Sequence, residues 1–383
     1  MIKSVEINNF KSIKHKYFPL RNLNVLLGLN GMGKSSFIQA LLMLKQSYNN
    51  SLHNGRVELN GSFVNIGKNK DALYQYSKEN LAFNVKFVDG KNLNLEFDYK
   101  READYLISKE KNGRGSSFEW LENRNDKQVL FSDNFQYLNT HRIKPISVHE
   151  KGYFSDAKIL GNRGQFTAHY IEEFGGDDIT FGNLLHKNSS TIDNSTGEKI
   201  VNNTLINQIN LWMREISPDI FIRTSSINSE SVLLEYEFNQ PNFGKTNKFR
   251  PENVGFGISY VLPVVTALLS AKQGELIIIE NPESHIHPRG QAELGKLIAL
   301  TAMNDVQIIV ETHSDHVLNG IRVAVREKEL SEHKVVLFYF DKVVEPSEQY
   351  SKVTNIEIDK HGELSDYPKN MLEEWSNQIL KLI

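Results

Sequence analysis

The stretch Leu276–Pro288, L-I-I-I-E-N-P-E-S-H-I-H-P, contains the pattern that most strongly constrains the fold. Four apolar residues end abruptly at Glu280, and Glu283, His285 and His287 follow at once. A short apolar run bounded by turn residues is typical of a strand that is covered on both faces. In phosphate-binding folds, an acid at the end of such a strand handles Mg²⁺ and water. The stretch therefore predicts one edge of a phosphate-handling site.

A phosphate loop that matches this edge lies near the start of the sequence. Gly28–Ser35 reads G-L-N-G-M-G-K-S, which fits G-x-x-x-x-G-K-[ST] at every fixed position. Glycines let backbone N–H groups converge on phosphate oxygens, and the start of the following helix adds partial positive charge. We expect Lys34 to reach the β- and γ-phosphates and Ser35 to ligate Mg²⁺. The residues expected to hold the nucleotide here are Asn30, Gly31, Gly33, Lys34, Ser35 and Ser36.

Two strand ends supply the expected catalytic groups. Glu280 is the natural partner of Ser35 for Mg²⁺, and Glu283 can orient the attacking water. A second apolar strand, V-Q-I-I-V-E-T-H-S, ends at His313, which can hydrogen-bond a γ-phosphate oxygen. Ser314 or Asp315 is expected to cap the next helix.

The histidines also permit other interpretations. A histidine-carboxylate cluster at two strand ends is chemically sensible as a metallohydrolase site. Its ligands would come from His285, His287, His313, His316, Glu283 and Asp315. Alternatively, His285 and His287 only cap or pack the turn. The residues alone leave these alternatives open.

Composition limits the class of protein. The 383 residues include no cysteine, which excludes disulfides, thiolate catalysis and cysteine-based zinc sites. A net charge of −3 argues against a strongly basic nucleic-acid protein. The start has no apolar signal core, and the longest apolar run, Tyr260–Ala271, is too short to span a bilayer. We expect a cytoplasmic protein without membrane contact.

The order of elements predicts an α/β fold. Strands are expected within 2–28, followed by a helix over 33–48, and the region 50–140 is strand-rich, with a hairpin turn at D-G-K-N. A helix is expected over 205–216. Strands and helices then alternate from 275 to 340, with one good strand at Val335–Phe340, which indicates a mostly parallel sheet. The tail, 367–383, has the spacing of an amphipathic helix.

Taken together, these segments resemble the ABC/SMC-like class of AAA ATPases, particularly the overcoming-lysogenization-defect (OLD) type. The similarity lies in F-K-S (Phe10–Ser12), the phosphate loop, the Leu276–Pro288 stretch and V-E-T-H-S. More closely, the chain resembles a bacterial subfamily that carries N-V-G-F-G-I-S-Y-V-L-P (Asn253–Pro263). That subfamily ends in a short domain of unknown function, which is similar here to Ile356–Pro368.

The resemblance implies an ABC-type P-loop NTPase head, an α/β fold with a mixed and parallel sheet covered by helices. A strand-rich and helical insertion would separate the phosphate loop (Walker A) from the signature segment. The expected division is 1–48 and 251–340 for the head, 49–250 for the insertion, and 341–383 for a small C-terminal segment.

The resemblance also implies a mechanism. Two heads would face each other as a homodimer, or within a higher oligomer, with ATP and Mg²⁺ held between one head's phosphate loop and the other's signature segment. Here that segment would be Asn253, Gly255, Gly257 and Ser259. ATP would close the dimer and hydrolysis would release it. Lys11 and Arg142 are candidates for the adenine contact.

Two departures from the family pattern matter. The position after the Walker-B acid, often the catalytic glutamate of the wider class, is Asn281, and an amide cannot act as a general base. Either Glu283 substitutes, or turnover is slow and the protein is mainly an ATP-gated switch. The tail has N-M-L-E (Asn370–Glu373) where the subfamily usually has an aromatic stretch.

The leading hypothesis is an ATP-hydrolysing dimeric switch that controls a separate effector, a nuclease or toxin, in bacterial anti-phage defence. The alternative is a repair or segregation ATPase that acts directly on duplex DNA. Its basis is a set of basic residues, Lys11, Lys14, His15, Lys16, Lys109, Lys111 and Arg114. A transporter subunit is disfavoured because the signature is not L-S-G-G-Q. A scaffold that holds ATP without turnover stays open. We expect no nuclease domain after His313, because only 70 residues follow it in the sequence.

Overall fold

The chain folds into two compact units in this computed structural model. The first comprises Met1–Phe135, Val335–Glu357 and Leu364–Ile383, and the second comprises Gln136–Lys334 and Ile358–Glu363. The structure describes residues 1–48, 51–77, 79–109, 120–122, 127–152, 159–192, 198–240, 242, 244–368, 371 and 380–382. The predicted tail helix and the N-M-L-E stretch lie almost entirely outside the described residues.

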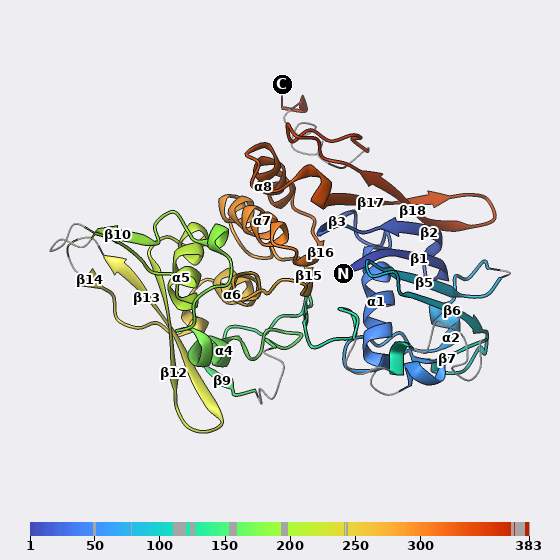
Figure 1. Ribbon diagram of the computed structural model, residues 1–383, viewed down its shortest axis with the longest axis horizontal. Helices are drawn as coiled ribbons and strands as arrows, with labels where there is room; N and C mark the ends of the chain where they lie inside the picture. The colour runs from blue at the N-terminus through green and yellow to red at the C-terminus, as the bar shows by residue number, and fades with distance from the viewer. Residues whose placement is uncertain are drawn as a thin grey trace. The chain divides into compact units, whose positions relative to one another are not determined.

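An antiparallel sheet of six strands forms one layer of the first unit (Figure 1). Its strands, in spatial order, are β2 (Ile13–Pro19), β1 (Ile2–Phe10), β5 (Ala82–Phe87), β6 (Asn92–Asp98), β7 (Tyr105–Ser108) and β4 (Arg56–Glu58). Alternate residues of β6 are buried, because successive side chains of a strand point to opposite faces. The predicted hairpin of β5 and β6, with Gly90 in its turn, is confirmed.

A second group of strands in the first unit leads to the phosphate loop. The strand β3 (Leu23–Gly28) pairs in parallel with β17 (Val335–Val344), and β17 pairs antiparallel with β18 (Gln349–Ile356). The helix α1 (Lys34–Tyr48) starts immediately after the loop and buries Phe37 and Leu41, as its spacing predicted. The prediction of a single good strand after His313 was wrong, since β18 is a second one. The remaining short elements are the 3₁₀ turns Leu52–Asn54 and Trp120–Glu122 and the helix α2 (Asn69–Ala72).

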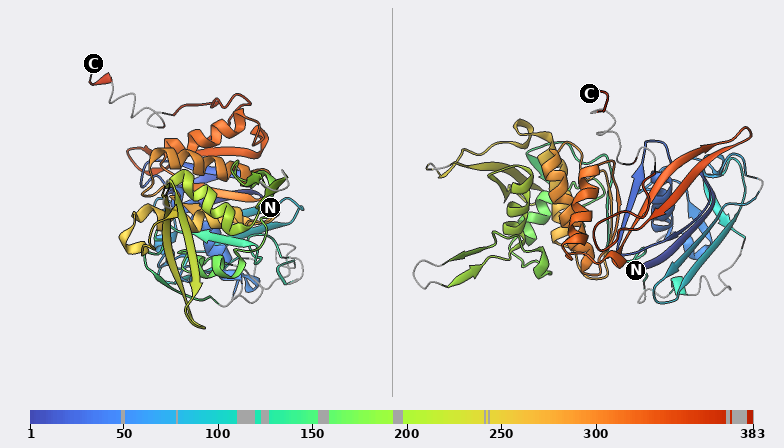
Figure 2. Two further views of the ribbon diagram at one scale, coloured as in Figure 1. Left: turned by 90° about the vertical axis from the view of Figure 1, so that its left-hand side faces the viewer. Right: turned by 90° about the horizontal axis from the view of Figure 1, so that it is seen from above.

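The second unit contains the acidic strand end. The strand β15 (Leu276–Glu280) pairs in parallel with β16 (Gln307–Glu311), in a register that sets Glu280 beside Glu311. Every residue of β15 before Glu280 is buried, as expected for a strand covered on both faces. The helices α7 (Pro288–Met303) and α8 (Asp315–Arg326) follow the two strands and lie side by side (Figure 1, Figure 2). The predicted alternation of strand and helix is confirmed.

The rest of the second unit combines a small antiparallel sheet with three helices. The helices α4 (Thr167–Phe174) and α5 (Leu205–Ile216) contact the sheet, and α6 (Phe256–Leu269) packs against α5 and α7. The sheet strands are β9 (Val148–Glu150), β12 (Ile220–Ser226), β13 (Ser231–Gln240) and β14 (Gly244–Lys245). A separate hairpin joins β10 (Ser190–Ile192) to β11 (Lys199–Val201). The other short elements are the 3₁₀ turns Gly182–Leu184, Pro251–Asn253 and Glu332–Lys334 and the strand β8 (Phe135–Leu138), whose first residue is assigned to the first unit.

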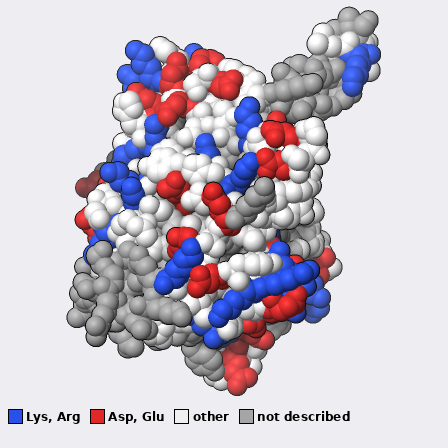
Figure 3. Space-filling model, turned by 90° about the vertical axis from the view of Figure 1, so that its right-hand side faces the viewer, with Lys and Arg blue, Asp and Glu red and all other residues white. Residues whose placement is uncertain are grey.

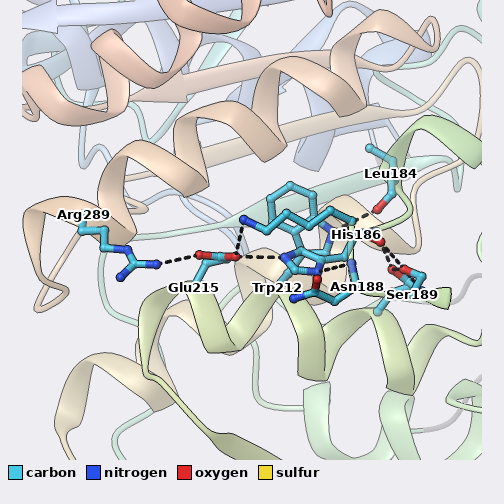
Figure 4. A network of polar contacts seen from close by, with 9 residues as sticks. Leu184, His186, Asn188, Ser189, Trp212, Glu215 and Arg289 are labelled. Carbon is cyan, nitrogen blue, oxygen red and sulfur yellow. Dashed lines mark hydrogen bonds and ion pairs between the residues drawn. The ribbon is translucent and has the colours of Figure 1, made fainter. Parts of the chain in front are cut away.

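A polar network ties α5 to the start of α7 (Figure 4). Glu215, near the end of α5, lies 3.1 Å from His186 Nε2, 3.3 Å from Lys187 Nζ and 3.1 Å from Arg289 Nη2. The ring of His186 packs edge-on against Trp212, whose indole N–H donates to the carbonyl of Leu184. The network therefore links three separate segments of the second unit through one carboxylate.

The predicted α/β class, with mixed and parallel sheets and helices, is confirmed. Within the described part of the chain, every helix is too short or too polar to cross a bilayer. The proposed boundaries at 48, 250 and 340 stay predictions.

Candidate functional site

The phosphate loop has a backbone that only glycine adopts readily. Gly28 has φ of 130° and Gly33 has φ of 105°, values that L side chains rarely adopt. A Cβ at Gly28 would lie 2.2 Å from the carbonyl oxygen of Phe340. A Cβ at Gly33 would lie 2.4 Å from Ser351 Oγ and 2.6 Å from Ser12 Oγ. Both glycines are therefore required by conformation and by close packing.

The side chain of Lys34 is hydrogen-bonded to the backbone of the phosphate loop. Its buried ammonium donates to the carbonyl oxygens of Gly28 at 2.8 Å and Leu29 at 3.0 Å. Lys34 is the first residue of α1, whose first turn carries no acidic side chain. The positive end of the helix dipole therefore adds to the lysine charge without neutralisation by a nearby acid in that turn. Ser35 is exposed in the same turn, whereas Ser36 is buried with its hydroxyl 3.5 Å from Ser12 Oγ.

Ser351, on strand β18, contacts the phosphate loop, and this role was not predicted from the sequence. Its hydroxyl donates to the carbonyl oxygen of Met32 at 2.6 Å and is hydrogen-bonded to Ser12 Oγ at 2.8 Å. The backbone N–H of Ser351 also donates to the carbonyl of Ser12 at 2.8 Å. No local signal could have indicated this contact, because Ser351 and Ser12 are 339 positions apart.

A cavity of about 330 Å³ adjoins the phosphate loop within the first unit. Its lining includes Lys11, Ser12, Gly31, Tyr74, Gln349 and Tyr350. Lys11 Nζ donates to Gln39 Oε1 at 2.8 Å, and burial lowers the pKa of this lysine. The cavity is lined by both polar and aromatic side chains, which suits a polar heterocycle or a sugar.

The acid at the end of β15 is held by two neighbours. Tyr137 donates its hydroxyl to Glu280 Oε1 at 2.9 Å. Burial raises the pKa of Glu280, although the bond from Tyr137 opposes this shift. Arg142 donates through Nη1 to the carbonyls of Glu280 at 2.8 Å and Asn139 at 3.0 Å, and through Nη2 to the carbonyl of Asn281. These hydrogen bonds show that the Arg142 guanidinium shapes the turn, and an adenine contact from Arg142 stays a prediction.

Glu283 has one restrained and one unpaired oxygen. Its Oε1 accepts from the backbone N–H of His313 at 2.9 Å. Its Oε2 is buried and lacks a hydrogen-bond partner among the described residues. An unpaired buried carboxylate oxygen is unfavourable unless a ligand or water satisfies it. The two strand ends are thus joined through Glu283 and His313, and the carboxylate keeps one oxygen available for such a group.

Asn281, the residue that departs from the family pattern, forms part of the backbone turn after β15. It has a left-handed φ of 44°, which asparagine tolerates better than most residues. Its N–H donates to the carbonyl of Glu311 at 2.8 Å, and its own carbonyl accepts from Arg142. Its side-chain Oδ1 is buried without a hydrogen-bond partner among the described residues. The residue fixes the turn that positions Glu283.

The histidines do not form the metallohydrolase cluster that the sequence left open. His287 Nδ1 accepts from the N–H of Arg289 at 3.3 Å and caps α7. The ring of His285 packs edge-on against Phe256 and Tyr260, at centroid distances of 5.0 and 5.2 Å. In the described part of the chain, one set of three metal-ligating side chains converges, namely His169, Glu172 and Glu173 on α4. The cluster hypothesis is therefore wrong, and the capping interpretation is correct for His287.

Ser314 confirms the predicted cap of α8. Its Oγ accepts from the N–H groups of His316 and Val317, both at 3.1 Å. The side chain of His313 is exposed just before this cap.

The signature segment divides into an exposed and an internal part. Asn253 and Gly255 are exposed, and Gly255 is the N-cap of α6. Gly257 is buried, and a Cβ there would lie 2.2 Å from the carbonyl of His285. The hydroxyl of Ser259 lies 3.1 Å from that of Tyr236 in the interior. The observed contacts of Gly257 and Ser259 are therefore internal, and a nucleotide contact from this segment stays a prediction.

Most of the basic residues that suggested a DNA-binding face form ion pairs or hydrogen bonds within the chain. Lys14 pairs with Glu348 at 2.6 Å, and Lys16 donates to the carbonyl of Val353 at 2.8 Å. Lys109 pairs with Glu96, and His15 lies 3.0 Å from Glu6. Acidic and basic side chains are interspersed on the face shown in Figure 3. Lys111 and Arg114 lie outside the described residues. The described members of the set thus give no support to a continuous basic surface.

The expected site residues fall into the two units. Lys11, Asn30, Gly31, Gly33, Lys34, Ser35 and Ser36 belong to the first unit, and Glu280, Glu283, His313, Asn253, Gly255, Gly257 and Ser259 belong to the second. Each set has its own supporting contacts within its unit.

A family model matches most of the chain. Residues 23–319 match the family described as "AAA domain, putative AbiEii toxin, Type IV TA system". The chain belongs to this AAA-domain family. Residues 330–382 match a second model, described as "Protein of unknown function (DUF3696)". These matches confirm the resemblance to an AAA ATPase family with a short C-terminal domain of unknown function. The OLD-type assignment stays a prediction. No curated protein matches the sequence significantly.

Similar solved structures are SMC head domains. One, a head bound to the C-winged helix domain of ScpA, is 12% identical, covers 93% of this chain and 98% of that chain, and has a TM-score of 0.48. Another, a Pyrococcus furiosus head with an extended coiled coil bound to the C-terminal domain of ScpA, is 12% identical, with coverages of 100% and 98% and a TM-score of 0.45. The head domain from Thermotoga maritima is 11% identical, with coverages of 92% and 98% and a TM-score of 0.42.

Proposed function

We propose that this AAA-family protein binds ATP with Mg²⁺ and hydrolyses it as a nucleotide-gated switch. The observation that carries the proposal is the phosphate loop itself. Gly28 and Gly33 have the backbone that the loop requires, and Lys34 is poised at the start of α1. Membership in the AAA-domain family supports the same nucleotide chemistry.

The residues present suit a triphosphate and a divalent cation. The loop offers Lys34 and the amides at the start of α1, a cationic cradle without an acid in the helix's first turn. Ser35 and Glu280 would hold Mg²⁺, because oxygen ligands are those that this ion prefers. When bound, ATP supplies the phosphoanhydride bond and Mg²⁺ supplies positive charge to the phosphate oxygens. Lys11 and the adjoining cavity are proposed to receive the nucleoside part.

Glu283 is the proposed catalytic group. Its buried Oε2 without a partner among the described residues is suited to accept a hydrogen bond and then a proton from water. The backbone N–H of His313 restrains the other oxygen and so orients the carboxylate. The side chain of His313 is proposed to contact the γ-phosphate. Since Asn281 cannot act as a base, we expect hydrolysis to be slow and to depend on Glu283.

We propose that ATP closes two copies of the chain head to head. The exposed Asn253 and Gly255 at the start of α6 would contact the partner's nucleotide. The closed dimer would control a separate effector, a nuclease or toxin, in bacterial anti-phage defence. The family description, which mentions a toxin–antitoxin system, supports this setting.

The direct test is nucleotide binding by Lys34→Ala. Equilibrium binding of a fluorescent ATP analogue, with Mg²⁺, is measured for wild type and for Lys34→Ala. Loss of the ammonium is expected to weaken binding at least about a hundredfold, since it removes a buried charge that we propose reaches the phosphates. The matched control is Lys68→Ala, because Lys68 is exposed and pairs with Glu102. Equal affinity for wild type and Lys34→Ala would show that the loop is not a phosphate site.

A further inference from the structure

The C-terminal domain of unknown function packs against both ends of the phosphate loop. Its strand β17 runs parallel to β3, and the Phe340 carbonyl occupies the space where Gly28 would carry a Cβ. Its strand β18 brings Ser351 against Gly33, with Ser351 Oγ 2.4 Å from the Cβ position of that glycine. The loop is therefore enclosed by residues from a segment more than 300 positions away in sequence.

The contact from Ser351 fixes one peptide plane of the loop. The Ser351 hydroxyl donates to the Met32 carbonyl at 2.6 Å. In a planar trans peptide, the carbonyl and the following N–H point in opposite directions. Anchoring the Met32 carbonyl toward β18 therefore turns the N–H of Gly33 away from β18. Amides of such a loop bind phosphate only when they converge, so this orientation bears directly on affinity.

Ser351 is itself well restrained. It is buried, with 7% of its surface exposed, and its backbone N–H donates to the Ser12 carbonyl at 2.8 Å. Its hydroxyl is also hydrogen-bonded to Ser12 Oγ. A side chain with both backbone and hydroxyl contacts of this kind holds one rotamer, and it can therefore hold the loop at little entropic cost.

We propose that the C-terminal domain of unknown function is a structural half of the nucleotide site, with Ser351 as a positioning residue for the phosphate loop. This inference rests on the proposed function, because it concerns the same loop. This role requires no direct contact between Ser351 and the phosphates, although Ser351 also lines the adjoining cavity. It acts through Met32, by holding the Gly33 amide in the orientation that a polyphosphate requires. Gln349 and Tyr350, on the same strand, line the adjoining cavity.

The test compares two probes in wild type and Ser351→Ala. The probes are a fluorescent ATP analogue and inorganic tripolyphosphate, which competes for the loop but has no base or sugar. Loss of one hydrogen bond that orients the loop is expected to weaken both affinities by about five- to tenfold. The control is Ser347→Ala, since Ser347 is exposed in the turn between β17 and β18 and is expected to keep wild-type affinities.

The two probes separate the outcomes. If Ser351→Ala weakens ATP but not tripolyphosphate, the residue acts on the nucleoside part, and the inference about the loop is overturned. Equal affinities in Ser351→Ala and wild type overturn it as well. If wild type itself binds neither probe, the proposed function fails.

Ser351→Cys retains a side chain of similar shape with a poorer donor and is expected to show a smaller loss in both affinities. Thermal melting without ligand shows whether each variant is folded. If Ser351→Ala does not fold, the test rests on Ser351→Cys, and wild-type affinities in that variant overturn the inference.

Discussion

At the scale of residues, few side chains position the acidic strand end. Glu280 is oriented by Tyr137, and Glu283 is restrained through the N–H of His313. The acids themselves could be predicted from the sequence because they follow an apolar strand. Tyr137 and Arg142 could not, since they are distant in sequence and carry no motif. Neither could the fate of His285, whose aromatic packing depends on α6.

A second carboxylate, Glu215, gives a residue-scale prediction of pH dependence. Its side chain is 10% exposed. Burial tends to raise its pKa, but hydrogen bonds from His186, Lys187 and Arg289 outweigh burial and lower the pKa below its ordinary value of 4.5. A lowered pKa in the folded state contributes stability that is present above the unfolded value. That contribution is lost as the pH falls through the folded value.

We therefore expect Glu215→Gln to reduce the free energy of unfolding by about 1–2 kcal/mol at pH 7. The deficit relative to wild type should shrink as the pH falls below about 4.5, because wild type then loses the same charge. Urea denaturation at pH 7 and at acidic pH measures both values. Glu230→Gln, at an exposed position, is the control. An equal deficit at both pH values would contradict the assignment of the stability to the ionised carboxylate.

At the scale of elements, the helices that follow the two acidic strands are packed unusually close. A Cβ at Gly320 of α8 would lie 2.1 Å from the Ala292 carbonyl of α7. A Cβ at Gly295 of α7 would lie 2.2 Å from the Val317 carbonyl of α8. Because both obstacles are backbone atoms, neither glycine can accept a side chain unless the helices separate.

Gly320→Ala is expected to lower the free energy of unfolding by about 1–3 kcal/mol, although alanine favours helix more than glycine does. The cause is the forced separation of α7 and α8. Gly176→Ala is the control, since a Cβ at that exposed glycine meets no atom within 4 Å, and its effect should stay within about 0.5 kcal/mol. Thermal and urea unfolding report the difference. A neutral Gly320→Ala would show that the helices do not depend on this close approach.

The elements themselves were predictable where the pattern is local. The hairpin of β5 and β6 follows from alternation and a turn, and α5 follows from apolar residues at helical spacing. The long strands β12 and β13 were not predicted. Exposed polar residues toward the end of β12 weaken its pattern, whereas β13 alternates buried and half-buried positions as a strand does and was overlooked. The strand β18 was also missed, since only two of its eight residues are buried. Such an edge strand depends on a neighbour that the local sequence does not reveal.

At the scale of the whole molecule, the proposal predicts that nucleotide changes the association state. In Glu283→Gln, ATP with Mg²⁺ should bind without being consumed, so the closed dimer should accumulate and the molar mass in light scattering should double. Lys34→Ala should not respond to ATP, because it lacks the phosphate contact. Gly255→Val, at the exposed start of α6, should bind ATP but not dimerise. Unchanged mass in Glu283→Gln with ATP would contradict the head-to-head clamp.

Two segments of the candidate site could be predicted from sequence motifs alone. The phosphate loop and the acidic strand end were predicted because each has a fixed spacing within one short segment. The support of the loop by β17 and β18 was not, because it joins the start of the chain to residues more than 300 positions later. Physical proximity of this kind leaves no pattern in either segment, and only the folded structure reveals it.

The measurement that tests the central claim most directly is the rate of ATP hydrolysis by Glu283→Gln at saturating ATP and Mg²⁺, relative to wild type. Glutamine keeps the shape of the side chain but cannot accept a proton from water. The account predicts that the rate falls by about a hundredfold or more while ATP affinity stays at the wild-type value. Turnover of Glu283→Gln at the wild-type rate would contradict it, and so would a wild type that binds ATP without hydrolysing it.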